Sequence, residues 1–251
     1  MRKLIALDFD GVICDSMDEC MLLSYNAYFN RSQDKGIDYS EISSELQIRF
    51  KKYRYLVGPA QDFYFLWKSL LSTNTSSSKE IVKIYHKLKS DDMGMELTFV
   101  ESFYFLRSKL KKDHFNQWIL LNPIYKQIKS ALIDVVDIDN LFIVTAKDTD
   151  SVLDLLHANN IEINRKQIYG REISLDKVNL FRQIIKETEI KPQNIFYIED
   201  KISHLIKVRT MGINGYLATW GYNSPSAKNE AMLNDITPIS LNEIFSIIIN
   251  S

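Results

Sequence analysis

Two aspartates separated by one residue follow a short apolar run near the N-terminus. Leu7 ends the run, and Asp8, Phe9, Asp10 and Gly11 come next. Carboxylates two residues apart in a loop can face one small volume, where they repel each other unless one is protonated or a cation lies between them. The pair therefore indicates covalent or acid–base chemistry, or a site for a cation. The plainer alternative is that one aspartate only caps the following helix.

Two later apolar runs also end in polar residues. Thr145–Lys147 follow one run, and Glu199–Asp200 follow the other. In open α/β sheets, ligands bind outside the carboxyl ends of the strands, so these residues are expected to join the N-terminal aspartates in one site. Carboxylate oxygens favour a hard cation. The sequence thus predicts a Mg²⁺ site at one edge of a parallel sheet.

The elements that must position these residues alternate between strands and helices. This alternation predicts a doubly wound parallel α/β sheet formed by residues 1–15 and 122–251. The expected strands cover residues 3–7, 141–144, 168–169, 195–198 and 215–217.

Residues 16–121 have a different pattern of apolar and polar residues, which predicts an inserted all-helical domain. They contain long helical patterns and no convincing strand. Gly58 and Pro59 interrupt these patterns, and the polar residues of Ser72–Ser78 predict a surface loop between two helices. The insertion follows directly after the first strand and its acidic loop, so it splits the α/β domain in the sequence.

Composition narrows the classes of function. The chain has 251 residues, a net charge of −1 and 45% apolar residues, which is typical of a folded protein with no overall affinity for nucleic acid or anionic lipid. Cys14 and Cys20 are too few for a disulfide framework. The N-terminal apolar run is too short for a signal peptide, and no stretch has the length of a membrane span. We expect a cytoplasmic protein that binds neither nucleic acid nor membranes.

Residues 4–16 resemble the first motif of the haloacid-dehalogenase-like (HAD) hydrolases, which is an apolar strand followed by Asp-x-Asp-Gly and then Asp-Ser. The resemblance implies a Rossmann-like core with a helical C1 cap. It also implies that Asp8 is a nucleophile that forms an aspartyl-phosphate, and that Asp10 is the general acid and base. In this reading Gly11 belongs to the loop that binds the substrate phosphate.

Three weaker motifs follow in the order that this family has. Thr145 resembles the second motif, whose hydroxyl binds the phosphoryl oxygens together with the amide of Ala146; alone, such a threonine is an ordinary strand residue. Lys177 resembles the third motif, a lysine near a helix start that offsets negative charge. Lys147 and Lys166 compete for this role, but the position of Lys177 before the next helix favours it.

The fourth motif carries the principal metal-binding acid, which corresponds to Asp200. The resemblance implies that Mg²⁺ is held by the side chains of Asp8 and Asp200 and by the backbone carbonyl of Asp10. The family usually has a second acid four residues further on, where this chain has His204. Imidazole is a poor Mg²⁺ ligand, so His204 is left out of the predicted metal site. Three consequences of this departure stay open: a weaker metal site, a shift of its water-mediated support to Glu199, or no effect.

The insertion and one C-terminal loop bear on specificity. A helical cap can exclude water and contact the substrate, and Arg49 and Arg54 are candidates for holding an anionic group. A solvated helix face is the alternative for this basic run. Residues 220–222 (Trp-Gly-Tyr) resemble a loop of the phosphoglycolate-phosphatase-like branch.

The predicted function is Mg²⁺-dependent hydrolysis of a small phosphorylated metabolite by a monomer or homodimer. A phosphomutase of the same superfamily has the same four motifs and remains an alternative. A non-catalytic binding or regulatory protein is the alternative from another class. His204 favours it, whereas the repulsive pair of Asp8 and Asp10 disfavours it, since a protein without chemistry has no physical need for such a pair.

Overall fold

The structure is a computed structural model that describes residues 2–32, 36–72, 77–91, 94, 96–134, 140–244 and 246–247. Its contacts divide the chain into two compact units, an α/β unit of Met1–Asp15 and Pro123–Ser251 and a helical unit of Ser16–Asn122. The boundary predicted from the sequence differs by one residue, because Asn122 lies in the helical unit. Within the described parts of the chain, no helix is both long and apolar enough to cross a membrane.

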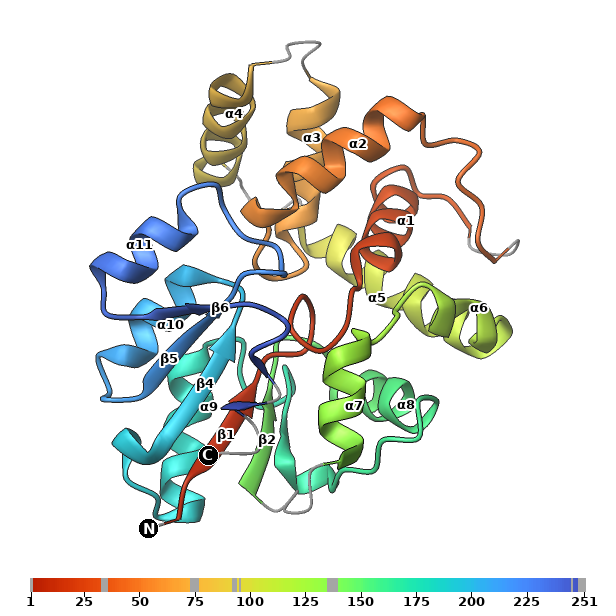
Figure 1. The fold of residues 1–251 in the computed structure, drawn as a ribbon. Coiled ribbons are helices and arrows are strands. Elements are labelled where there is room, and N and C mark those ends of the chain that lie inside the picture. The colour runs from red at the N-terminus through yellow and green to blue at the C-terminus, as the bar shows by residue number, and fades with distance from the viewer. Residues whose placement is uncertain are drawn as a thin grey trace. The chain divides into compact units, whose positions relative to one another are not determined.

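The α/β unit is built on a six-stranded sheet in the order β3-β2-β1-β4-β5-β6, and all neighbouring strands are parallel. Figure 1 shows β1, in red, between β2 and β4. This arrangement confirms the predicted fold class. The strands are β1 (Leu4–Leu7), β2 (Leu141–Val144), β3 (Ile168–Tyr169), β4 (Ile195–Glu199), β5 (Asn214–Ala218) and β6 (Thr237–Ile239).

The edge strand β6 was not predicted from the sequence. It contains Pro238, which pairs in register with Leu217 of β5. A proline lacks a backbone N–H, so it weakens the sequence signal of a strand and is tolerated mainly at sheet edges. The strand is a product of packing against β5 rather than of local preference.

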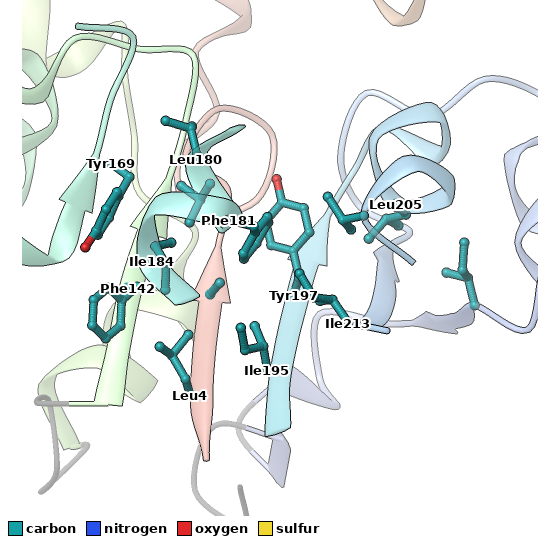
Figure 2. Close-up of a cluster of buried hydrophobic side chains, with 14 of the residues drawn as sticks. Leu4, Phe142, Tyr169, Leu180, Phe181, Ile184, Ile195, Tyr197, Leu205 and Ile213 are labelled. Atoms are coloured by element: carbon teal, nitrogen blue, oxygen red, sulfur yellow. The ribbon is translucent and has the colours of Figure 1, made fainter. Parts of the chain in front are cut away.

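One face of the sheet carries a continuous apolar core under α9 (Lys177–Thr188), α10 (Ile202–Arg209) and α11 (Ala227–Leu233). Figure 2 shows Leu180, Phe181 and Ile184 of α9 above the central strands. The ring of Phe181 packs edge-on against Tyr197 of β4, with centroids 4.8 Å apart. This packing fixes the start of α9 over the carboxyl ends of β1 and β2.

The helices α7 (Lys126–Asp134) and α8 (Thr149–His157) precede β2 and β3 and bury their own apolar faces. Crossover connections between parallel strands are right-handed, so a sheet that winds from β1 to β3 and then returns to β4 places these helices opposite α9. Side chains alternate between the two faces of a strand, which leaves Ile5 and Leu7 of β1 for that second face. Both residues are buried.

Short 3₁₀ turns complete the described elements: η1 (Arg54–Leu56) in the helical unit, and η3 (Arg165–Gln167) and η4 (Pro192–Asn194) before β3 and β4. The described part of the helical unit otherwise contains α-helices alone. The predicted loop at Ser72–Ser78 lies mostly outside the described residues, since 73–76 are not described. The helices are α1 (Met17–Tyr28), α2 (Ser44–Tyr53), α3 (Asp62–Leu71), α4 (Ser78–Ser90), α5 (Glu96–Asp113) and α6 (Phe115–Leu120).

Aromatic side chains form the core of the helical unit. Trp67 of α3 is fully buried, stacks on Phe50 with centroids 4.8 Å apart, and packs edge-on against Tyr25. Its indole N–H donates to the hydroxyl of Ser24 at 2.7 Å, so the polar end of the ring is satisfied. Trp67 and the aromatic rings that contact it therefore form the core of the helical unit.

A buried ion pair ties α1 to α5 within the helical unit. Glu19, with no exposed surface, accepts two hydrogen bonds of 2.8 Å from the guanidinium of Arg107 and one of 2.7 Å from the indole of Trp118. Bidentate charge-assisted geometry is the arrangement that best offsets the free energy of removing both charges from water. The pair fixes the register of the two helices.

We expect Glu19→Gln to lower the free energy of unfolding of the helical unit by about 3–5 kcal/mol, because it removes the carboxylate that makes two charge-assisted hydrogen bonds to the buried guanidinium of Arg107. Urea denaturation followed by tryptophan fluorescence measures this. Asp113→Asn, which removes an exposed i,i+4 pair with Lys109, serves as the control and should change stability by less than about 0.5 kcal/mol. Equal effects of the two substitutions would contradict the assigned role of the buried pair.

Candidate active site

Asp8 lies at the carboxyl end of β1 and is nearly buried. Its backbone N–H donates to the carbonyl of Ile198 at 2.9 Å, and its side chain is 11% exposed. The Oδ1 atom accepts a hydrogen bond of 2.8 Å from Nζ of Lys177. Lys177 is the first residue of α9, whose N-cap Asp176 accepts a hydrogen bond from the N–H of Val178. The helix start therefore delivers the ammonium group to the end of the central strand.

Lys177 rather than Lys147 or Lys166 contacts Asp8. Its ammonium also donates to the carbonyl of Val144 and lies 3.5 Å from Oε2 of Glu199. Lys166 is exposed on η3. Lys147 is buried too, but its Nζ donates to Oδ1 of Asp10 at 3.1 Å. Each of the two first-motif aspartates thus has its own lysine, which the sequence did not predict.

A tight turn carries Asp10 and Gly11 away from β1. The amides of Ile13 and Cys14 donate to the carbonyl of Phe9, and Gly11 has φ +86°. A Cβ atom on Gly11 would lie 2.4 Å from Oδ2 of Asp200, so only glycine fits between the turn and this carboxylate. The glycine of the Asp-x-Asp-Gly sequence therefore allows the close approach of two segments far apart in the chain.

Thr145 and Ala146 follow β2 at the same edge of the sheet. Thr145 is buried, its N–H donates to the carbonyl of Tyr169, and its hydroxyl accepts a hydrogen bond from the N–H of Lys147 at 3.1 Å. Ala146 is half-buried. The structure therefore brings together the residues that the sequence singled out at the ends of β1 and β2.

Asp200, directly after β4, is 1% exposed and is held by a loop after β5. Its Oδ2 accepts a hydrogen bond of 2.6 Å from the N–H of Tyr222. A Cβ on Gly221 would lie 2.4 Å from Cβ of Asp200 and 2.5 Å from the carbonyl oxygen of Gly11. The same loop contacts the first motif, since the indole of Trp220 donates to the carbonyl of Val12.

Sequence reasoning used residues 220–222 only as a mark of one family branch and missed this supporting role. The available signal was a glycine between two aromatic residues directly after a strand. In a strand-to-loop junction such a glycine indicates close approach of another backbone. Tyr222 adds a second link, because its hydroxyl donates to Oδ1 of Asp15 at 2.9 Å.

Oxygen atoms of three buried carboxylates lie within 4.8 Å of one another, and they belong to Asp8, Glu199 and Asp200. Burial, reinforced by the charge of Glu199 and opposed by Lys177, raises the pKa of Asp8 to about 7. Burial also raises the pKa of Asp200 well above its usual value. Although burial acts against it, Lys177 and His204 hold the pKa of Glu199 well below its usual range. Negative charge is therefore undercompensated at Asp8 and Asp200.

The donor set fits a hard divalent cation. All of the clustered ligand atoms are carboxylate oxygens, which Mg²⁺ prefers. Four carboxylates and two ammonium groups are linked at this edge of the sheet, which leaves a charge of −2 when all are ionised. They are Asp8, Asp10, Glu199 and Asp200 with Lys147 and Lys177. A bound dication would neutralise this charge.

The two arginines proposed for substrate binding belong to the helical unit. Arg54 is buried there, donates to the carbonyl of Val57 and lies over the ring of Phe63 at 4.9 Å. These contacts hold its guanidinium within that unit, and a role of Arg54 toward an anionic substrate stays a prediction. Arg49 is half-buried on α2. A role of Arg49 toward an anionic substrate stays a prediction.

Comparison with solved structures identifies the fold. A predicted phosphatase from Clostridium acetobutylicum matches with a TM-score of 0.65 and 18% identity over all of both chains. A predicted phosphoglycolate phosphatase from Haemophilus somnus matches with a TM-score of 0.61 and 17% identity, covering 98% of this chain and 97% of the other. A haloacid dehalogenase-like family hydrolase from Streptococcus pneumoniae matches with a TM-score of 0.57 and 19% identity over the same shares.

No family model matches the chain, and neither does any curated protein. The similarity to solved structures extends over nearly the whole chain, whereas the identities are below one in five. These matches show that the chain has the fold of the HAD-like hydrolases, as its first motif predicts.

The raised pKa of Asp8 predicts how the stability of the protein depends on pH and on a bound cation. Stability that depends on a protonated Asp8 is present at low pH and is lost as the pH rises through about 7, because ionisation is unfavourable in the folded, metal-free site. A divalent cation held by these carboxylates would offset this loss. At tenfold excess over its dissociation constant, a ligand of the folded state stabilises by about 1.4 kcal/mol.

We therefore expect Mg²⁺ to raise the melting temperature more at about pH 8 than at about pH 5.5, with NaCl at matched ionic strength as the control. Differential scanning calorimetry measures both shifts. Asp200→Asn should reduce the shift at the higher pH. An equal shift by Mg²⁺ at both pH values would contradict the metal site.

Proposed function

We propose that this protein, which has the fold of the HAD-like hydrolases, is a Mg²⁺-dependent phosphatase that hydrolyses a small phosphate monoester through an aspartyl-phosphate. One observation carries the proposal. The Asp8 carboxylate is bound by a buried lysine and also belongs to a cluster of three buried carboxylates. Such a group can attack phosphorus while its surroundings hold the positive charge that the phosphoryl oxygens need.

In the first step, an oxygen of Asp8 attacks phosphorus and the bond to the ester oxygen breaks. Asp10, in its protonated form, gives its proton to the leaving oxygen, so that the product is a neutral alcohol. The Asp10 carboxyl is within hydrogen-bonding distance of Lys147, which fixes its orientation. The phosphoryl group is then bound to Asp8 as a mixed anhydride.

In the second step, water attacks the phosphorus of the aspartyl-phosphate. The Asp10 carboxylate takes the proton of this water, the bond from Asp8 to phosphorus breaks, and inorganic phosphate leaves. Both catalytic groups return to their starting states. Lys177 and the hydroxyl of Thr145 offset or bind the negative charge of the phosphoryl oxygens in both steps.

Mg²⁺, when bound, supplies positive charge next to the transferring phosphoryl group. Asp8 and Asp200 would hold it through their side chains, together with the backbone carbonyl of Asp10. Burial of these carboxylates, which raises the pKa of both side chains, supports this assignment, because an uncompensated pair would otherwise retain a proton.

A phosphomutase would contain the same groups and would return the phosphoryl group to its substrate. Release of inorganic phosphate separates the two, since a mutase releases it slowly. A non-catalytic binding protein would show neither reaction. The most informative assay is a screen of sugar phosphates, nucleotides and phosphoglycolate for phosphate release, with and without Mg²⁺.

Asp8→Asn should lower kcat for a generic aryl phosphate by at least about 10³-fold, because the amide is a poor nucleophile. Phosphate release is the measurement, and circular dichroism checks that the variant is folded. Asp150→Asn is the matched control, since Asp150 is an exposed aspartate of the same unit that pairs with Arg165. Activity of the Asp8 variant equal to that of the control would refute the nucleophile.

Asp10→Asn should impair turnover by about 10²–10⁴-fold, the usual contribution of a general acid or base. Its effect depends on the leaving group. A nitrophenolate leaves without protonation, so an aryl phosphate should still give a burst of nitrophenol close to one equivalent per enzyme, followed by slow hydrolysis. An alkyl phosphate should give no burst. Stopped-flow absorbance and phosphate assays distinguish these outcomes, and an unaltered rate for both substrates would exclude the acid–base role.

A further inference from the structure

Glu199 is the most heavily hydrogen-bonded carboxylate among the clustered acids. It has no exposed surface. Its Oε1 accepts hydrogen bonds from the backbone N–H groups of Asp200 at 3.0 Å and Lys201 at 3.1 Å. Its Oε2 accepts one from the hydroxyl of Tyr197 at 2.5 Å and lies 3.0 Å from Nδ1 of His204.

These four contacts use the full acceptor capacity of a carboxylate, which has about four lone-pair positions. The ammonium of Lys177 is a fifth neighbour, 3.5 Å from Oε2. A group surrounded in this way is ionised and has one permitted orientation. It acts on its neighbours as a fixed negative charge.

His204 approaches this carboxylate from the first turn of α10. An ionised carboxylate only accepts hydrogen bonds, so Nδ1 of His204 must carry the proton and donate to Oε2. The side chain is 28% exposed, and its contact with Glu199 ties it to the site. Tyr197 and Glu199 are two residues apart on β4 and share one face of the strand.

Two parts of the site depend on the position of Glu199. Its Oε2 lies beside Lys177, whose ammonium contacts Asp8. Its Oε1 accepts from the N–H of Asp200 and so fixes the backbone that carries the Asp200 carboxylate. A shift of Glu199 would therefore move both the lysine beside the nucleophile and one of the predicted metal ligands.

We propose that His204 is a positioning residue that, with Tyr197, locks Glu199 in place and through it orients Lys177 and Asp200. His204 binds no metal. It occupies the position where the resembled family has an acid. In this chain the residue at that position contributes a hydrogen-bond donor to the carboxylate of Glu199 on β4. The inference rests on the proposed function for its effect on turnover, whereas its effect on cation affinity is independent of turnover.

The test measures Mg²⁺ affinity of the substrate-free protein by isothermal titration calorimetry. His204→Phe removes the donor and keeps a ring, and it should weaken Mg²⁺ binding by about tenfold or more, the usual effect of losing an outer partner of a metal site. His204→Asn places an N–H near the position of Nδ1 and should bind within about threefold of wild type. His157→Phe is the matched control, because His157 pairs with Glu162 on the surface of α8, and it should leave affinity unchanged.

Equal affinities of the Phe and Asn variants would overturn the inference, whether both matched wild type or both were equally weakened. Urea unfolding without metal checks that each variant is folded. If His204→Phe does not fold, Tyr197→Phe gives the second test, since it removes one hydroxyl donor from the same oxygen and should also weaken Mg²⁺ binding. In a double variant the two effects should be smaller than the product of the single effects, because both donors act on Oε2. Single effects that multiply fully in the double variant would contradict the proposal that both donors act on Oε2.

The outcomes also separate this inference from the proposed function. A wild-type protein that binds Mg²⁺ with the predicted pattern but releases no phosphate from any monoester would refute the phosphatase and leave the role of His204 intact. Hydrolysis by the wild-type protein, with no difference in Mg²⁺ affinity or kcat between the His204→Phe and His204→Asn variants, would refute only the positioning role of His204. Absence of Mg²⁺ binding by the wild-type protein would overturn both.

Discussion

Electrostatic repulsion among carboxylates is the constraint on which the site depends. Asp8, Glu199 and Asp200 are crowded at one buried edge of the sheet, where water cannot screen them. Folding tolerates this arrangement because lysines and backbone N–H groups offset much of the charge. The negative charge that is not offset attracts a cation or the positive groups around a phosphoryl transition state. The repulsion among these carboxylates therefore both destabilises the folded site and equips it for chemistry.

The parallel sheet determines which groups can meet. Because every strand runs in one direction, the loops after β1, β2, β4 and β5 all emerge at one edge. Two glycines then allow contacts that side chains would prevent. Gly11 lies against Asp200, and Gly221 lies against both Asp200 and the carbonyl of Gly11. The α9 helix, which covers one face of the sheet, brings Lys177 to the site. The apolar packing of Phe181 against Tyr197 holds this helix in place (Figure 2).

The helical unit contains its own interactions that select one packing arrangement of its helices. Its aromatic core around Trp67 and the buried pair of Glu19 and Arg107 are complete within residues of that unit. A buried ion pair contributes little net stability, but it strongly disfavours wrong registers because a misplaced charge would be left alone.

The sequence by itself determined the α/β class, the helical insertion and the positions of the first five strands to within one residue at each end. It also singled out the strand-end residues Asp8, Thr145 and Asp200, and Lys177 at a helix start, as candidates. These follow from local signals, namely apolar periodicity and the types of residue that end a strand. Only the tertiary structure decided which lysine contacts which aspartate, that Glu199 is an anchor bound by His204, and that residues 220–222 support Asp200. Lys177 and Asp8 are 169 residues apart and Lys147 and Asp10 are 137 residues apart, so these pairings depend on how the sheet and helices pack. Even the shorter link between Tyr222 and Asp200 depends on how the loops after β4 and β5 meet. The edge strand β6 was missed for the same reason, because Pro238 suppresses the local signal and pairing with β5 supplies the structure.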